Sequence, residues 1–167
     1  DIRLSAKLNI NGEALVLICN VKGSMIMDGL ARLRDKNVAL KKTGEAIGKE
    51  FNIEAINAVE NPQPKPADLL FIVGGIYACQ CNPDLLSYAE KLDTSIVRKV
   101  VLVTSSTSIN QRSQRDLRSI LEKKGIDVVD EITCTGGFLF IKLGHPNKKD
   151  IQAVVEKAKE ISGSCLK

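Results

Sequence analysis

The residues best suited to chemistry follow an apolar run at positions 69–73. There the sequence reads Gly74–Tyr77 (GGIY). Glycine lets a backbone approach a flat ligand closely, and a tyrosine ring can stack on it. A second segment, Thr104–Ser108 (TSSTS), offers hydroxyls and backbone N–H groups that suit the polar edge of a ring. The alternative interpretation is a pair of ordinary turns, with Tyr77 as a half-buried surface aromatic.

Two cysteines, Cys79 and Cys81, lie one residue apart directly after the first segment. Such a pair can bind a metal with ligands from elsewhere, or cycle as thiols beside a redox cofactor. Zinc usually takes four ligands, and the single histidine, His145, lies in a Gly-His-Pro-Asn turn typical of a helix entry. We therefore expect reduced, metal-free thiols, and we assign no catalytic residue. Cys19 and Cys134 are expected to be buried small residues near strands.

The composition indicates one soluble domain spanning residues 1–167. The chain is 44% apolar and 26% charged, which suits a folded core. No apolar stretch approaches the roughly 20 residues of a membrane span, and no secretory leader is evident. Five cysteines at scattered spacing argue against a disulfide framework and favour a reducing compartment. We expect a cytoplasmic protein that binds neither membrane nor nucleic acid.

A basic stripe at helical spacing is formed by Arg112, Arg115 and Arg118. One interpretation is a surface for nucleic acid or an acidic partner. The other is a solvated helix face. Because Asp116 and Glu122 are interspersed and aromatic residues are absent from the stripe, the second interpretation is favoured. The net charge of +4 is mild and does not change this conclusion.

Three apolar runs predict strands buried on both faces: Ala14–Cys19, Leu69–Val73 and Val100–Val103. Apolar residues that follow one another without alternation are typical of a parallel sheet covered by helices on both sides. Ile53–Val59 and Val128–Cys134 are weaker strand candidates. Helices are predicted at 38–51, 82–92, 111–124 and 147–161, the last with a capping arrangement of Asn147 and Asp150. The fold class is therefore α/β, a doubly wound parallel sheet with helices on both faces.

The order of the predicted elements gives further expectations. Ala14–Cys19 should lie beside Leu69–Val73 inside the sheet. The proline-rich segment 60–68 (ENPQPKPAD) is too rich in proline for a full helix, but it is long enough to pass one intervening strand. Residues 1–12 are expected to form an N-terminal extension that packs away from the sheet or pairs only beyond it.

Four stretches in the second half of the chain resemble the flavodoxin family. GGIYACQCNPDLLSYAEKL resembles the second flavin loop and its helix, VLVTSSTS resembles the third flavin loop, and DLRSILEKKGIDVVDEITCTG continues the pattern. GHPNKKDIQAVVEKAKEI resembles the C-terminal turn and helix. The resemblance implies a five-stranded flavodoxin-like sheet, FMN as cofactor, and electron transfer or small reductive chemistry. The ring contacts that it implies are Gly74, Gly75, Ile76 and Tyr77 on one side and Thr104, Ser105, Ser106 and Thr107 on the other.

The phosphate loop departs from the family pattern. The first strand of the family is normally followed by a short Ser/Thr-rich loop that ends in Gly-Asn-Thr at a helix start. Here Asn37 takes the Asn position and Val38 replaces the Thr, after an insertion-like segment at residues 22–36 that includes a possible helix at Met25–Leu33. Either this region has no phosphate role or it forms a substitute cradle. The candidate cradle residues are Asn20, Lys22 and Ser24.

Two functions of different class follow from these patterns. The first is an FMN-dependent oxidoreductase or electron carrier that works with a redox partner protein or a small-molecule acceptor. The second is a flavodoxin-like domain that has lost the flavin and serves as a binding or regulatory module. If FMN binds, the altered phosphate loop predicts weak binding, with riboflavin binding nearly as well.

Overall fold

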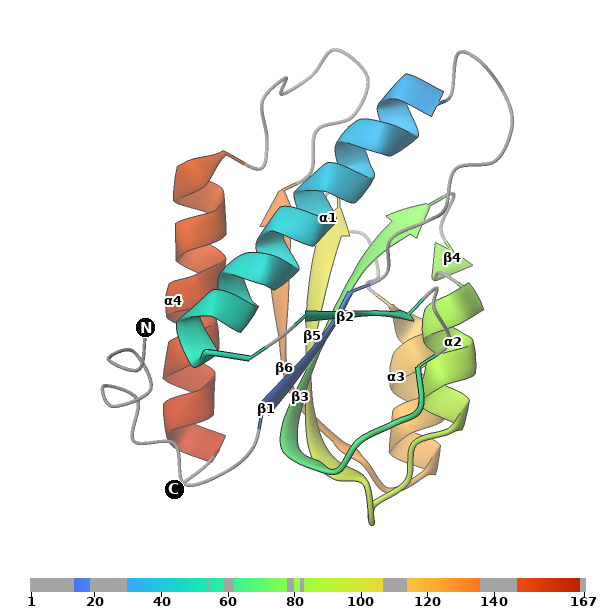
Figure 1. The fold of residues 1–167 in the computed structure, drawn as a ribbon. Helices are drawn as coiled ribbons and strands as arrows, with labels where there is room; N and C mark the ends of the chain where they lie inside the picture. The colour runs from blue at the N-terminus through green and yellow to red at the C-terminus, as the bar shows by residue number, and fades with distance from the viewer. Residues whose placement is uncertain are drawn as a thin grey trace.

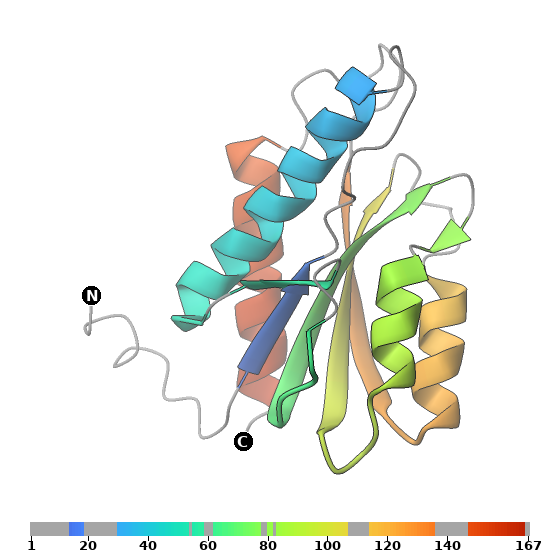
Figure 2. The same ribbon diagram turned by 45° about the vertical axis from the view of Figure 1, so that its right-hand side comes forward.

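The computed structural model describes a sheet between two layers of helices (Figures 1 and 2). This arrangement confirms the α/β prediction. The predicted extension at residues 1–12 lies outside the described part of the chain. The backbone is described for residues 14–18, 30–53, 55–58, 62–77, 80–81, 83–106, 114–135 and 147–165. Side chains are described for residues 41–53, 55–58, 62–74, 83–104, 114–133 and 147–165.

The neighbouring strands of the sheet run parallel. Their order is β2 (Ala55–Asn57), β1 (Ala14–Ile18), β3 (Ala67–Tyr77), β5 (Val97–Ser106) and β6 (Asp127–Thr135). The predicted adjacency of the first two apolar runs is confirmed, because the Ala14–Ile18 strand pairs in register with residues 69–73. Since β1 lies between β2 and β3, the proline-rich connection does pass an intervening strand.

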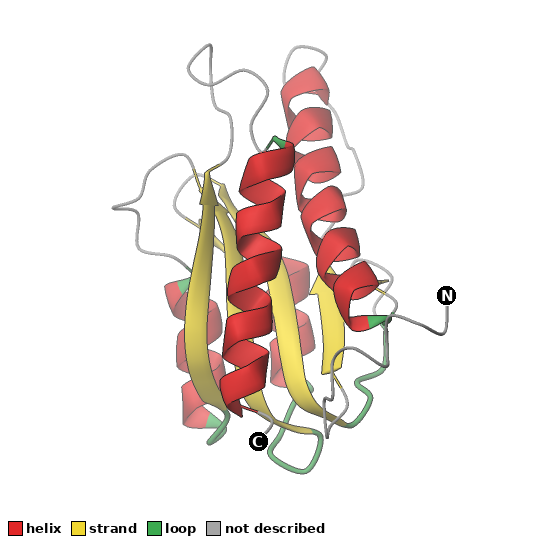
Figure 3. Cartoon of the chain, turned by 90° about the vertical axis from the view of Figure 1, so that its left-hand side faces the viewer, coloured by secondary structure: helices red, strands yellow, loops and turns green. Residues whose placement is uncertain are grey.

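The helices divide between the two faces of the sheet (Figures 1 and 3). Helices α1 (Leu30–Phe51) and α4 (Lys148–Cys165) cover one face. Helices α2 (Pro83–Glu90) and α3 (Arg115–Lys123) cover the other. Among the described residues, no helix combines the length and the apolar character that crossing a membrane requires.

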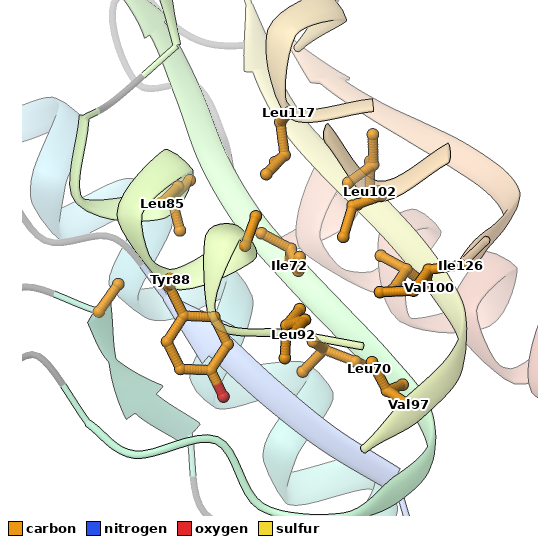
Figure 4. Close-up of a cluster of buried hydrophobic side chains, with 13 residues drawn as sticks. Leu70, Ile72, Leu85, Tyr88, Leu92, Val97, Val100, Leu102, Leu117 and Ile126 are labelled. Carbon is orange, nitrogen blue, oxygen red and sulfur yellow. The ribbon is translucent and has the colours of Figure 1, made fainter. Parts of the chain in front are cut away.

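The central strands contribute side chains to two separate cores. In β3, Phe71 and Val73 pack with residues of α1 and α4, whereas Leu70 and Ile72 pack with residues of α2 and α3. Strand β5 alternates in the same way. Figure 4 shows the second cluster, in which side chains of α2 and α3 face those of β3 and β5. Burial on both faces explains why these strands are continuous apolar runs in the sequence.

Helix α1 corrects the prediction for the region after the first strand. A new helix was expected near Asn37, after a separate helical piece in the insertion-like segment. Instead, one helix of 22 residues begins at Leu30, so that Asn37 lies inside it. The sequence LARLRDKNVAL contains neither glycine nor proline, and an established helix therefore continues through it. Residues 30–36 are thus an N-terminal extension of the helix rather than a separate element.

Gly48 lies near the end of α1, at a point where the chain approaches itself closely. A Cβ atom at this position would lie 2.6 Å from the carbonyl oxygen of Ile53. The Ile53 N–H donates to the Gly48 carbonyl at 2.8 Å, which turns the chain back toward β2. Glycine at position 48 is therefore explained by the way the helix ends.

Strand β3 corrects a second prediction, because it does not end at the glycine pair. The strand continues to Tyr77, and its last two residues pair antiparallel with β4 (Gln80–Cys81). The neighbouring strand β5 also continues to Ser106 and supplies pairing partners for both glycines. Strand β3 therefore continues through Gly74 and Gly75, which have low strand propensity, because β5 pairs with both glycines and β4 pairs with the two residues after them.

Candidate functional site

The carboxyl ends of β3 and β5 bring the two predicted ring-side segments together. In open parallel sheets, ligands bind beyond the carboxyl ends of the strands. The parallel register pairs Gly74 with Thr104 and Gly75 with Ser105. The Gly74–Tyr77 and Thr104–Ser106 stretches therefore end at the same edge of the sheet, as the sequence predicted for a shared ligand edge.

Thr104 is the centre of a buried hydrogen-bond chain. Its hydroxyl donates to Oε1 of Glu131 at 3.0 Å and accepts from Nε2 of Gln114 at 2.8 Å. The Thr104 side chain is completely buried, and Gln114 is 1% exposed. Both partners of the hydroxyl therefore lie inside the protein, and the buried Thr104 side chain is not exposed to a bound ring.

The chain continues from Glu131 to the surface of α3. Nη2 of Arg118 donates to Oε2 of Glu131 at 3.2 Å, and Nη1 of Arg118 lies 3.5 Å from Oε1 of Glu122. Arg118, a member of the predicted basic stripe, is thus paired with two carboxylates. The charge of Arg118 is therefore balanced within the protein, and the interpretation of the stripe as a solvated helix face stays a prediction. Arg112 lies outside the described residues.

Gln114 occupies an unusual backbone conformation directly before α3. Its φ of 29° and ψ of 43° lie in the left-handed region, which costs a non-glycine residue roughly 1–2 kcal/mol. The predicted helix start at 111 is therefore corrected, because α3 begins at Arg115. The turn at Gln114 directs its amide toward Thr104. Sequence reasoning missed this residue because glutamine in a polar stretch gives no signal of burial.

Gly74 is surrounded by side chains of the protein itself. A Cβ atom at this position would lie 2.5 Å from Cδ1 of Leu85 and 3.0 Å from Oε1 of Gln114. Leu85 is fully buried. The space next to Gly74 on the side of α2 and α3 is therefore filled from within. This packing replaces close approach of a ligand as the reason for glycine at position 74.

The remaining predicted contacts are described only in part or lie outside the described residues. Gly75, Ile76 and Tyr77 have their backbone in β3, and Ser105 and Ser106 have theirs in β5. No group of three or more His, Cys, Asp or Glu that could bind a metal occurs within the ranges the structure describes. Cys81 lies in β4. Among the predicted flavin contacts and the Cys79/Cys81 pair, the residues outside the described part of the chain are Asn20, Lys22, Ser24, Cys79 and Thr107.

The strand order β2-β1-β3-β5-β6 is that of a flavodoxin-like fold, and several solved structures share this fold. An oxidoreductase from Corynebacterium diphtheriae has a TM-score of 0.53 and 11% identity, covering 92% of this chain and 95% of that chain. An azoreductase from Bacillus anthracis has a TM-score of 0.51 and 8% identity, covering 91% and 99%. An NAD(P)H:quinone oxidoreductase from Methanothermobacter marburgensis has a TM-score of 0.50 and 10% identity, covering 89% and 98%. No family model and no curated protein matches the sequence. At these identities the likeness concerns the fold alone.

Proposed function

We propose that this chain is an FMN-binding flavodoxin-like protein that acts in electron transfer or small reductive chemistry in the cytoplasm. The main support is the pairing of Gly75 with Ser105 at the carboxyl ends of adjacent parallel strands. This is the location at which such sheets bind ligands. The fold is also that of several solved oxidoreductases. Bound FMN would supply one- or two-electron transfer to a redox partner protein or a small-molecule acceptor.

The residue types at this edge suit a flavin ring. Gly75 has no side chain that would keep a ligand away from the backbone of β3. Ser105 and Ser106, at the end of β5, are residues with hydroxyl groups. We therefore propose that the ring lies beyond the carboxyl ends of β3 and β5, against the segments Gly75–Tyr77 and Ser105–Thr107. Gly74 and Thr104 are left out because their surroundings are filled by the protein. If the altered loop forms a phosphate cradle, its candidate residues are Asn20, Lys22 and Ser24.

The experiment is a comparative titration of the purified protein with FMN and riboflavin, followed by flavin fluorescence. A phosphate site contributes charge-assisted hydrogen bonds worth about 1.5–3 kcal/mol each. Losing two of them weakens binding by roughly a hundredfold or more. We expect riboflavin, which lacks the phosphate, to bind nearly as well as FMN. Much tighter binding of FMN would show that Lys22–Ser24 or another segment forms a phosphate cradle. Failure of both flavins to bind would reject the proposal.

A second candidate function is a flavodoxin-like binding or regulatory module without flavin. The observation that favours it is the internal packing at Gly74 and Thr104, which removes two of the predicted ring contacts from a ligand. This function predicts a purified protein that is colourless and binds neither flavin, yet shows the circular dichroism and cooperative thermal transition of a folded α/β domain. A yellow protein that releases FMN on denaturation would reject this candidate.

A further inference from the structure

The hydrogen-bond chain through Thr104 connects three elements, α3, β5 and β6, at the proposed flavin edge. It starts at Gln114, which precedes α3, and reaches Thr104 in β5 over 2.8 Å. It continues to Glu131 in β6 over 3.0 Å and returns to Arg118 in α3 over 3.2 Å. Below we call these four residues the Gln114 chain.

The Glu131 carboxylate determines which group donates and which accepts in each hydrogen bond of the Gln114 chain. A carboxylate only accepts hydrogen bonds, so Glu131 receives both the Thr104 hydroxyl and the Arg118 guanidinium. With its proton directed to Glu131, the Thr104 hydroxyl accepts from the amide nitrogen of Gln114. The Gln114 amide is thereby oriented, and its oxygen lies on the side of Gly74.

The Gln114 chain lies one residue before the proposed ring contacts. Thr104 pairs with Gly74, and the next pair in the ladder is Gly75 with Ser105. Gln114 lies beside both members of the first pair: its amide nitrogen donates to the Thr104 hydroxyl, and its amide oxygen lies 3.0 Å from where a Cβ atom of Gly74 would be. Any shift of Gln114 therefore acts on the two strand ends that carry the proposed contacts.

We infer that Gln114 is a positioning residue for the flavin ring. It does not itself contact the ligand in this proposal. Its hydrogen bond to Thr104 and its packing beside Gly74 fix where the ends of β5 and β3, already paired through their backbones, present the ring contacts. The inference rests on the proposed function. A residue that acts on the ring side changes the affinity for FMN and for riboflavin by the same factor, because both ligands share the ring.

The test compares variants at two positions of the Gln114 chain with a matched control. Gln114→Leu removes the amide at similar size, and Thr104→Val removes the hydroxyl. Ser162→Ala is the control, since Ser162 is also 1% exposed and its hydroxyl donates to the Lys159 carbonyl at 3.0 Å within α4. The dissociation constants for FMN and riboflavin, the visible circular dichroism of the bound flavin and the melting temperature are measured for each variant.

We expect Gln114→Leu and Thr104→Val each to weaken the binding of both flavins by up to about tenfold, because the order that one buried hydrogen bond gives the strand ends must then be supplied on binding. The visible circular dichroism of the bound flavin should change with them, and the ratio of the two affinities should stay as in the parent protein. The double variant should lose little more than either single variant. Thr104→Ser retains the hydroxyl and should recover most of the affinity. Ser162→Ala should lower the melting temperature without changing either dissociation constant.

Three results would overturn the inference. In the first, Gln114→Leu binds both flavins as tightly as the parent while its melting temperature falls, which would make Gln114 merely structural and leave the proposed function intact. In the second, Gln114→Leu does not fold and Thr104→Val binds like Thr104→Ser. In the third, the parent protein binds neither flavin; this rejects the proposed function and the inference together, and is recognised before any variant is compared.

Discussion

A methyl group added at position 74 would enter space that is already filled. It would lie 2.5 Å from Cδ1 of Leu85 and 3.0 Å from Oε1 of Gln114. Both neighbours are buried, so neither can move aside without disturbing the core. Overfilling a packed site typically costs about 1–3 kcal/mol. We therefore expect Gly74→Ala to lower the free energy of unfolding by about this amount, measured by urea denaturation.

The control for this substitution is Gly163→Ala in α4. A Cβ atom there would meet nothing within 4 Å. Because alanine is the better helix former, Gly163→Ala should raise the free energy of unfolding by about 0.5–1 kcal/mol. If Gly74→Ala were as stable as the parent, the side chains of Leu85 and Gln114 would not fill the space as the structure describes.

Asp93 forms an exposed turn that depends on its negative charge. Oδ1 of Asp93 accepts hydrogen bonds from the hydroxyl and the backbone N–H of Ser95, the latter at 2.8 Å, and from the N–H of Ile96 at 3.2 Å. The hydrogen bond from the Ser95 side chain is the largest cause that lowers the pKa of Asp93, followed by the one from the Ser95 backbone. The charged form is therefore favoured in the folded protein.

The consequence is a specific acid sensitivity. A carboxyl whose pKa is lowered on folding stabilises the protein above its unfolded pKa, and this stability is lost as the pH falls through the folded pKa. We expect the stability difference between the parent and Asp93→Asn to be largest near neutral pH and to shrink as the pH falls below the ordinary aspartate range. Urea midpoints measured across this pH range check it, and a difference that does not vary with pH would contradict it.

At the scale of elements, the start of α4 is the feature that the sequence predicted best. Oδ1 of Asn147 accepts from the N–H groups of Lys149 at 2.8 Å and Asp150 at 3.1 Å. Oδ2 of Asp150 accepts from the Asn147 N–H at 2.7 Å. These reciprocal bonds confirm the predicted capping arrangement. They satisfy backbone donors that would otherwise have no partner within the helix.

We expect Asn147→Ala to lower the free energy of unfolding by about 1 kcal/mol, because the cap acceptor is lost. Thermal or urea denaturation measures the change. A matched control is Gln152→Ala in the same helix, which removes an exposed contact of 2.7 Å to Glu156. That contact, four residues along the helix, should contribute no more than about 0.5 kcal/mol. Equal effects of the two substitutions would argue against the cap.

The elements that could be predicted are those whose signals are local. Continuous apolar runs indicated β1, β3 and β5, and the helix predicted at 82–92 agrees with α2, which begins at Pro83. The boundaries that were predicted wrongly, the end of β3 and the start of α3, depend on tertiary contacts. Strand β3 passes its glycines because β5 pairs with them, and α3 starts late because Gln114 turns inward to Thr104. No pattern in the polar stretch before α3 reports either contact.

At the scale of the whole molecule, the candidate site could be located from the sequence but not assembled from it. Both segments were expected at the carboxyl edge, and the register of β3 and β5 brings them together. However, the sequence could not show that the Thr104 hydroxyl is bonded inside the protein. Glu131, its acceptor, lies 27 residues away in the sequence and gives no sign of this role. Long-range polar pairing is decided by packing, which a single sequence does not reveal.

The two cores lie on opposite faces of one sheet and share its central strands. Ile47 of α1 belongs to the first core and Leu117 of α3 to the second, and both are fully buried. Strands β3 and β5 contribute alternate residues to each core. If one core unfolds and β3 and β5 separate, the other core loses the same two strands. We expect the chain to unfold as one cooperative unit, as small single domains usually do.

The test uses Ile47→Ala and Leu117→Ala, each of which should lower the free energy of unfolding by about 2–5 kcal/mol. The chain has two tyrosines and no tryptophan, so in a Tyr77→Phe background the fluorescence of Tyr88 reports on the second core alone. Far-ultraviolet circular dichroism reports on the whole chain. If the cores are coupled, Ile47→Ala shifts the Tyr88 transition as far as it shifts the circular dichroism, although Ile47 lies on the opposite face. A Tyr88 transition that stays at the parent midpoint in Ile47→Ala would show that the faces unfold separately.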